Sequence, residues 1–180
     1  MKKHLAIIST IFISITALTF YSCDEFNTLP LNIPFVVDFS ASGASLQDTG
    51  TLCVGESETY QDYRDKIKEI KLLKITYRTK SVSPVDITCN IRIIVKRQDN
   101  GATLFNQVIS NVKPKNYLPP NPPYVFTLSQ TELQLFDDYL RLLGDPCFEV
   151  TFQAENVTGG NPPYSIEGAS DILFEAITEL

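Results

Sequence analysis

The sequence predicts a mainly β fold, an antiparallel β-sandwich of about seven strands with one short α-helix. Several segments alternate apolar and polar residues, which is the period of a strand with one buried face. Residues that favour turns separate these segments, and the crossover helices that parallel strands require are missing from the pattern. Two antiparallel sheets packed face to face fit these observations.

The first predicted strand covers residues 33–42, in which three bulky side chains fall on alternate positions: Phe35, Val37 and Phe39. Small and polar residues at 41–50 predict a loop. A short strand at 51–54 follows, and then a polar connection at 55–66 that has room for one helical turn.

The segment 67–80 is ambiguous. Ile67 and Ile70 are spaced as on one face of a helix, but the second half alternates and is interpreted as a strand. The apolar positions of that strand are Leu73, Ile75 and Tyr77. The segment 85–96 is the clearest strand in the chain, with six apolar residues at alternate positions: Val85, Ile87, Cys89, Ile91, Ile93 and Val95.

A β-hairpin is predicted directly after this strand. Asn100-Gly101 separates it from the apolar segment 103–109. An Asn-Gly pair between two alternating segments is typical of a tight turn, because both central residues of that turn take positive φ. A proline-rich loop at 113–123 then leads to a further strand at 124–128.

One helix is predicted to begin after Ser129. Ser129 and Glu132 have the spacing of a capping box, in which a hydroxyl and a carboxylate bind the first free backbone N–H groups of a helix. Gly144, followed by a proline, ends the helix. Its apolar residues at helical spacing are Leu133, Phe136, Leu140 and Leu143. The last two strands are predicted at 147–155 and 170–178.

Residues 1–22 have the pattern of a secretory signal peptide. Lys2 and Lys3 precede an uncharged run of 16 residues, from Leu5 to Phe20. This run is shorter than the about 20 apolar residues that a membrane-spanning helix needs. A cleaved export signal is therefore expected, with a signal anchor or a buried helix as the alternatives.

The segment Leu18–Glu25, LTFYSCDE, resembles the lipobox of bacterial lipoproteins of the Bacteroidota type. In these proteins a cysteine that follows a small residue is acylated and becomes the first residue of the mature chain, and Ser22 and Cys23 match that pattern. Phe20 and Tyr21 stand where the strict pattern has leucine and a small residue. The two acids after the cysteine resemble the signal for display on the cell surface.

This resemblance implies a protein held in the bacterial cell envelope by a lipid anchor in the outer membrane, on the periplasmic side or at the cell surface. Acyl chains such as palmitate on Cys23 would make the membrane a direct partner. Each buried CH₂ contributes about 0.8 kcal/mol, and more than one chain gives stable anchoring. Residues 23–32 then form a lipidated tether, and residues 33–180 form a single domain long enough for one core.

Charge and residue types argue against several functions. The net charge is −6, and it falls to −8 without Lys2 and Lys3, which opposes binding to nucleic acid and to anionic membrane surfaces. The single histidine, His4, lies in the leader, so the remaining chain has no histidine for a catalytic nucleophile or a metal site. We therefore predict no catalytic residues, no cofactor, no metal site and no enzymatic activity. A carboxylate-based hydrolase is the remote alternative, with Asp137 and Asp138, or Glu56 and Glu58, as candidate acids.

Three cysteines follow Cys23. An exported protein permits a disulfide, and Cys53 and Cys147, which both lie near strand ends, are the expected pair. Cys89 lies on the apolar face of its strand and is expected to be buried and free.

The expected function is non-enzymatic, in binding or in envelope architecture, with an envelope protein or a glycan as partner. The alternative is a surface module that binds a glycan or a protein through tyrosine- and proline-rich loops at 115–124 and 161–164, where the motif NPPY occurs twice. The candidate binding residues are Tyr117, Tyr124 and Tyr164. The same motif is also a good loop terminator followed by a strand-forming residue, and this structural interpretation is the favoured one, because the flanks of the two copies share nothing else.

Overall fold

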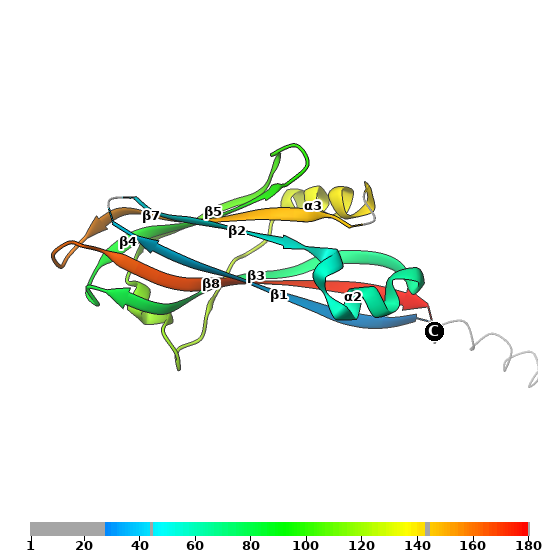
Figure 1. Cartoon of the computed structure of the whole chain (residues 1–180), viewed down its shortest axis with the longest axis horizontal. Helices are drawn as coiled ribbons and strands as arrows, with labels where there is room; N and C mark the ends of the chain where they lie inside the picture. The colour runs from blue at the N-terminus through cyan, green and yellow to red at the C-terminus, as the bar shows by residue number, and fades with distance from the viewer. Residues whose placement is uncertain (1–27, 44, 143–144, 180) are drawn as a thin grey trace, which may run out of the picture.

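The computed structural model of the chain describes residues 28–43, 45–142 and 145–179. These residues form two four-stranded sheets that lie face to face, with the strands along the long axis of the molecule (Figure 1). Every strand pairing is antiparallel, and the predicted β-sandwich is confirmed. The signal peptide, Cys23, Leu143 and Gly144 lie outside the described residues.

The first sheet has the order β1-β8-β3-β6. Its strands are β1 (Thr28–Ser42), β8 (Ser165–Glu179), β3 (Ile67–Ser83) and β6 (Tyr124–Val125). The second sheet has the order β2-β7-β4-β5. Its strands are β2 (Leu46–Cys53), β7 (Cys147–Thr158), β4 (Thr88–Arg97) and β5 (Thr103–Val112). The helical segments are η2 (Val54–Glu56), α2 (Glu58–Tyr63), η3 (Arg64–Lys66), η4 (Pro114–Tyr117) and α3 (Gln130–Leu142).

The pairings are nested: β1 pairs with β8, β2 with β7, β3 with β6, and β4 with β5. The chain therefore follows the path of one long hairpin that is rolled across both sheets, which is the topology of a jelly roll. The predicted hairpin at Asn100-Gly101 is its innermost turn. That turn is wider than predicted, because Arg97 N–H donates to the Ala102 carbonyl at 2.9 Å and Gly101, but not Asn100, has positive φ.

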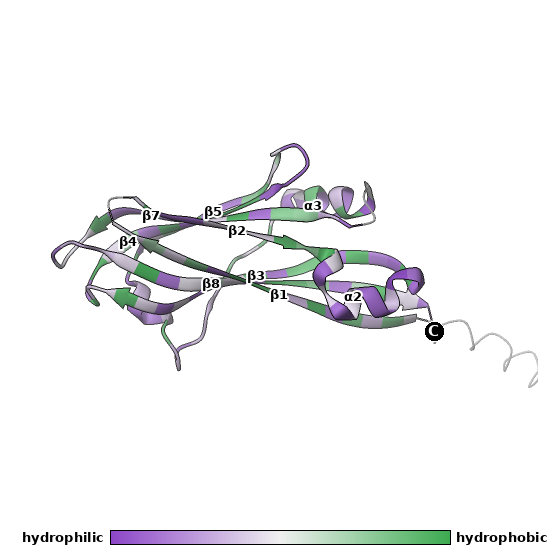
Figure 2. Cartoon of the chain, viewed as in Figure 1, coloured by the Kyte–Doolittle hydropathy of each residue, from purple (hydrophilic) through white to green (hydrophobic). Residues whose placement is uncertain are grey.

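The two sheets are joined by aromatic side chains from their inner faces. Phe39 of β1 stacks on Phe152 of β7 with 4.1 Å between ring centroids, and Phe148 stacks on Phe174 of β8 at 5.7 Å. One side of the sandwich is closed where β1 meets β2, and the other where α3 packs on β3 and β5. Figure 2 shows hydrophobic and hydrophilic residues alternating along the strands, whereas α2 and the β4–β5 turn are mostly hydrophilic.

Helix α3 begins at the predicted capping box. Glu132 N–H donates to Ser129 Oγ at 3.2 Å, and Ser129 N–H donates to the Glu132 carboxylate at 2.8 Å. Phe136 and Leu140 of this helix are buried, as their spacing predicts.

Several predicted boundaries were wrong. Residues 46–50, predicted as a loop, belong to β2, and β1 begins at Thr28, inside the segment predicted to be a tether. The whole of 67–83 is strand, including the part with helical spacing, and β8 begins at Ser165 rather than at residue 170. The described residues form eight strands, where about seven were predicted, and α2 is a second helix where one turn was allowed.

Two residues predicted to face the core are exposed. Between Leu72 and Lys74 the pairing of β3 with β8 shifts by one residue, so Leu72 is buried and Leu73 is 44% exposed. Such a bulge breaks the alternation from which Leu73 was assigned to the core. Val85 lies in the turn before β4 and is 51% exposed, whereas the other five apolar residues of that segment are buried.

Candidate functional site

The two ends of the sandwich differ in what they carry. At one end, here called the terminal end, Thr28 pairs with Glu179, so the first residues of β1 and the last of β8 lie side by side (Figure 1). At the opposite end, here called the distal end, Gly43 N–H donates to the Tyr164 carbonyl at 3.1 Å. The 15 residues of β1 connect the two ends. At about 3.3 Å for each residue, they lie about 45 Å apart.

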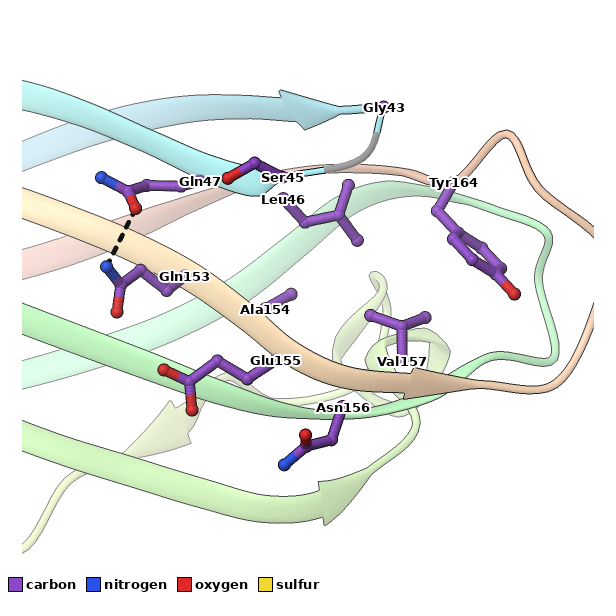
Figure 3. Close-up of a pocket in the computed structure, with 10 residues that line it drawn as sticks. All are labelled: Gly43, Ser45, Leu46, Gln47, Gln153, Ala154, Glu155, Asn156, Val157 and Tyr164. Atoms are coloured by element: carbon purple, nitrogen blue, oxygen red, sulfur yellow. Dashed lines mark hydrogen bonds between the residues drawn. The ribbon is translucent and has the colours of Figure 1, made fainter.

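A pocket of about 490 Å³ opens at the distal end (Figure 3). It forms because β7 runs past the first residue of β2: Leu46 pairs with Ala154, and β7 continues to Thr158. The side chains of β7 beyond Ala154 therefore have no β2 neighbour, and Glu155, Asn156 and Val157 line the pocket together with Tyr164.

The pocket wall is mostly polar. Gln153 Nε2 donates to Gln47 Oε1 at 3.0 Å, and Glu155 and Asn156 add a carboxylate and an amide. Glu155 also pairs with Arg92 at 3.1 Å, which fixes its direction along the sheet. Apolar surface comes from Leu46, Val157 and Tyr164.

Asn156 has a structural reason to be an asparagine. Its φ is +54°, and it lies where the pairing of β7 with β4 shifts between Thr88 and Asn90. Asparagine tolerates this left-handed conformation better than most residues. The bulge aims the end of β7 toward the pocket.

The three candidate tyrosines do not form one cluster in the described part of the chain. Tyr117 and Tyr124 contact each other edge to face at 5.9 Å, and both pack against the core, Tyr117 on Tyr77 and Tyr124 on Phe126. Burial raises the pKa of Tyr117, and the nearby Tyr124 adds to that effect. Tyr164 lines the distal pocket instead, with no recorded ring contact to the other two.

Of the residues that line this pocket, the sequence pattern singled out Tyr164 but not the glutamine pair or Glu155. No local signal marks these residues, because the pocket depends on how far β7 extends beyond β2.

A second, shallower hollow of about 310 Å³ lies over β1, β8 and β3, beside the first half of β2. Its three acids already have partners. Asp38 pairs with Lys80 at 2.7 Å, Asp48 accepts from the Ser40 N–H at 2.7 Å, and Glu167 accepts from Ser81 at 2.9 Å. The candidate acids of α3 differ from each other in exposure, with Asp137 half-buried and Asp138 exposed and bound by Gln134 at 2.8 Å.

Cys53 and Cys147, the pair expected from the sequence, are joined by a disulfide that connects β2 to β7 at the first residue of β7. Cys89 is free and buried. Burial raises the pKa of its thiol to about 11, so it is protonated at neutral pH and is a poor nucleophile.

In the described part of the chain, no group of three or more histidine, cysteine or acidic side chains is arranged to hold a metal ion. Nor is any described helix both long and apolar enough to cross a membrane.

No protein-family model matches the sequence, and no curated protein is significantly similar to it. Among solved structures, Desmodium yellow mottle tymovirus gives a TM-score of 0.39 at 12% identity, covering 85% of this chain and 83% of that one. Turnip yellow mosaic virus gives 0.36 at 9%, covering 84% and 94%. The Gt strain of infectious bursal disease virus gives 0.36 at 9%, covering 87% and 34%. These scores are below 0.5, so no argument rests on them.

Proposed function

We propose that the chain is a non-enzymatic lipoprotein of the bacterial envelope, acylated at Cys23, that presents a ligand-binding end away from the membrane. One observation carries this proposal: β1 begins at the terminal end, and a pocket of about 490 Å³ lies at the distal end. Thr28 lies five positions after Cys23, and this stretch of chain spans at most about 18 Å. An anchor at Cys23 would thus keep the terminal end near the bilayer and hold the pocket about 45 Å farther out.

The lining of the pocket supports a polar ligand, and a glycan fits it best. Amide side chains such as Gln47, Gln153 and Asn156 both donate and accept hydrogen bonds, as sugar hydroxyls do. Tyr164 adds a ring that can pack on the apolar face of a sugar. The volume of about 490 Å³ falls in the range of small-molecule sites. A polar segment of an envelope protein is the other partner with this chemistry.

Fatty-acid labelling tests the anchor. Cells that express the chain are grown with a radioactive fatty acid, and the labelled protein is compared with the Cys23→Ala and Cys89→Ala variants. Label should appear in the parent and in Cys89→Ala and be absent from Cys23→Ala. Equal labelling of all three proteins would refute acylation at Cys23.

A glycan array tests the distal pocket, with the soluble Cys23→Ser chain as probe. Tyr164→Ala and Gln153→Ala should fail to bind the glycans that the parent chain binds on the array. Tyr63→Ala is the control, because Tyr63 is an exposed tyrosine of α2 at the terminal end, whereas Tyr164 is half-buried at the distal end. Binding that survives in Tyr164→Ala, or that Tyr63→Ala reduces equally, would place the ligand elsewhere.

A further inference from the structure

A second site lies at the terminal end. A pocket of about 250 Å³ opens where three elements meet: α2 with the following η3, the start of β3, and the last turn of α3. Ile67, on its wall, pairs with Thr178, which pairs in turn with Leu29. This pocket, here called the terminal notch, is therefore next to the residues with which the described chain begins.

The rim of the notch is basic, although the whole chain is acidic. Arg64, Lys68 and Arg141 line it, together with one acid, Glu69. Arg64 and Lys68 are close in sequence, in η3 and β3, and the fold brings Arg141 of α3 beside them.

The ion pairs that these cations form are weak. Lys68 pairs with Glu179 at 2.9 Å, but both side chains are more than half exposed, and such pairs contribute about 0–1 kcal/mol. Arg141 lies 3.7 Å from Glu69, whose carboxylate is already bound by Lys71 at 2.9 Å. Arg64 has no recorded ion pair among the described residues.

The floor of the notch is apolar. Tyr60 and Leu140 are buried, and Ile67 and Ile70 are half-buried and pack against the core. Burial raises the pKa of Tyr60; the charge of Arg64 opposes that effect, and the charge of Asp145 adds to it. An apolar floor beneath a basic rim suits a molecule with an anionic head and an apolar body rather than a free inorganic anion.

We propose that the terminal notch binds the headgroup of an anionic phospholipid, with Arg64, Lys68 and Arg141 around the phosphate, so that the terminal end rests on the bilayer. The notch and the anchor would act together, because a tether of at most about 18 Å keeps the notch within reach of the headgroups. This inference rests on the proposed anchoring, but it is tested on a chain that has no anchor.

The test uses the mature chain with Cys23→Ser, which retains all of the described core. Binding to vesicles of phosphatidylcholine is compared with binding to vesicles that also contain phosphatidylglycerol, at low salt. The unacylated chain should bind only the anionic vesicles, and added salt should weaken the binding.

The double variant Arg64→Gln/Arg141→Gln should lower the partition coefficient about 30-fold, because each basic side chain near an anionic surface contributes about a factor of five. Lys96→Gln/Lys113→Gln is the matched control, since it removes the same charge from β4 and from the residue before η4. Thermal unfolding of both variants confirms that they are folded.

An equal loss in the control variant would mean that net charge, and not the notch, governs binding, and would overturn the proposal. So would equal binding to both kinds of vesicle. Displacement from the vesicles by millimolar inorganic phosphate would assign the notch to a free anion instead. Because fatty-acid labelling at Cys23 is measured separately, failure of the notch leaves the anchor untouched.

Discussion

Gly168 lies opposite Phe39 in the pairing of β1 with β8, and the aromatic ring occupies the space that a side chain at 168 would need. A Cβ on Gly168 would be 2.6 Å from the Phe39 ring and 2.5 Å from the Arg78 carbonyl oxygen. The Phe39 ring also stacks on Phe152 of the other sheet. The glycine is thus required by close packing, because its backbone is not in the left-handed region.

We expect Gly168→Ala to lower the free energy of unfolding by about 1–3 kcal/mol, the usual cost of overpacking a core. Urea denaturation measures it. Because the clash involves the Phe39 ring, the cost of Gly168→Ala should be smaller when it is combined with Phe39→Leu. Strictly additive costs in this double-mutant cycle would contradict the packing argument.

The cap of α3 depends on two side chains. Ser129→Ala removes the acceptor for the Glu132 N–H, and we expect it to destabilise the protein by about 1 kcal/mol, as loss of an N-cap usually does. Ser110→Ala is a suitable control, because Ser110 is exposed on β5. Both variants can be compared by urea denaturation, and equal midpoints would show that the cap contributes nothing.

Glu132 makes this cap sensitive to acid. Burial alone would raise the pKa of Glu132, but hydrogen bonds from Ser129 and Gln107 outweigh burial and hold the pKa below its ordinary value of 4.5. A lowered folded-state pKa contributes stability that is present above 4.5 and is lost as pH falls through the folded-state value. The stability difference between the parent and Glu132→Gln should therefore be full at neutral pH and shrink below 4.5. Denaturation at a series of pH values measures it, and a difference that grows in acid would have the wrong sign.

At the scale of single elements, β2 shows why a strand can escape prediction. Its first five residues include Asp48, Thr49 and Gly50, which give no apolar alternation. The strand forms because β7 supplies the pairing, and because Val37 of β1 packs where a side chain at 50 would lie, 2.6 Å from the position of its Cβ. These causes are tertiary, so the local sequence cannot report them.

The edge of β1 is protected by residues whose role appears only once the pairing is known. The backbone N–H of Ser40 points away from β8 and donates to Asp48. Every second residue of β1 therefore has its backbone N–H directed outward, away from β8. Pro30 and Pro34 occupy two of these positions, and proline has no backbone N–H that could be left unpaired at the edge. Proline at such positions blocks the addition of another strand.

The disulfide ties β2 to β7 across a sequence separation of 94 residues. Removing it with Cys53→Ala/Cys147→Ala should lower the free energy of unfolding by about 2–5 kcal/mol, because the unfolded chain loses a long-range constraint. Denaturation with and without reductant measures the effect: reductant should destabilise the parent and leave the double variant unchanged. A parent indifferent to reduction would contradict this expectation.

At the scale of the whole molecule, the fold class could be predicted but the topology could not. Alternation in 85–96 and 147–155 indicates half-buried strands, and this suffices for a sandwich. Of the six pairings, however, only β4 with β5 joins strands that are consecutive in sequence. The order of the other strands, and with it the distal pocket and the terminal notch, depends on contacts between distant segments that leave no local pattern.

Among the six described strand pairings, β4 with β5 is the one that can form between neighbouring segments of the unfolded chain. The other five pairings join strands that are distant in sequence. Folding slows as contacts become more distant in sequence. Thr28 and Glu179 are paired neighbours, so a short glycine linker can join them and new ends can be opened elsewhere.

Two circular permutants test this argument. One opens between Asn100 and Gly101, which turns the β4–β5 pairing into a contact between the two ends of the chain. The control opens between Gly159 and Gly160, in the β7–β8 connection, where the strands on either side are in different sheets and no hairpin is cut. Both should reach the same fold, because the contacts of the native state are unchanged. In stopped-flow refolding, the first should fold about tenfold more slowly than the control, since closing a long loop must precede its first strand pairing. Equal refolding rates would show that the β4–β5 hairpin does not form first, and that folding begins from the long-range pairs around the aromatic core.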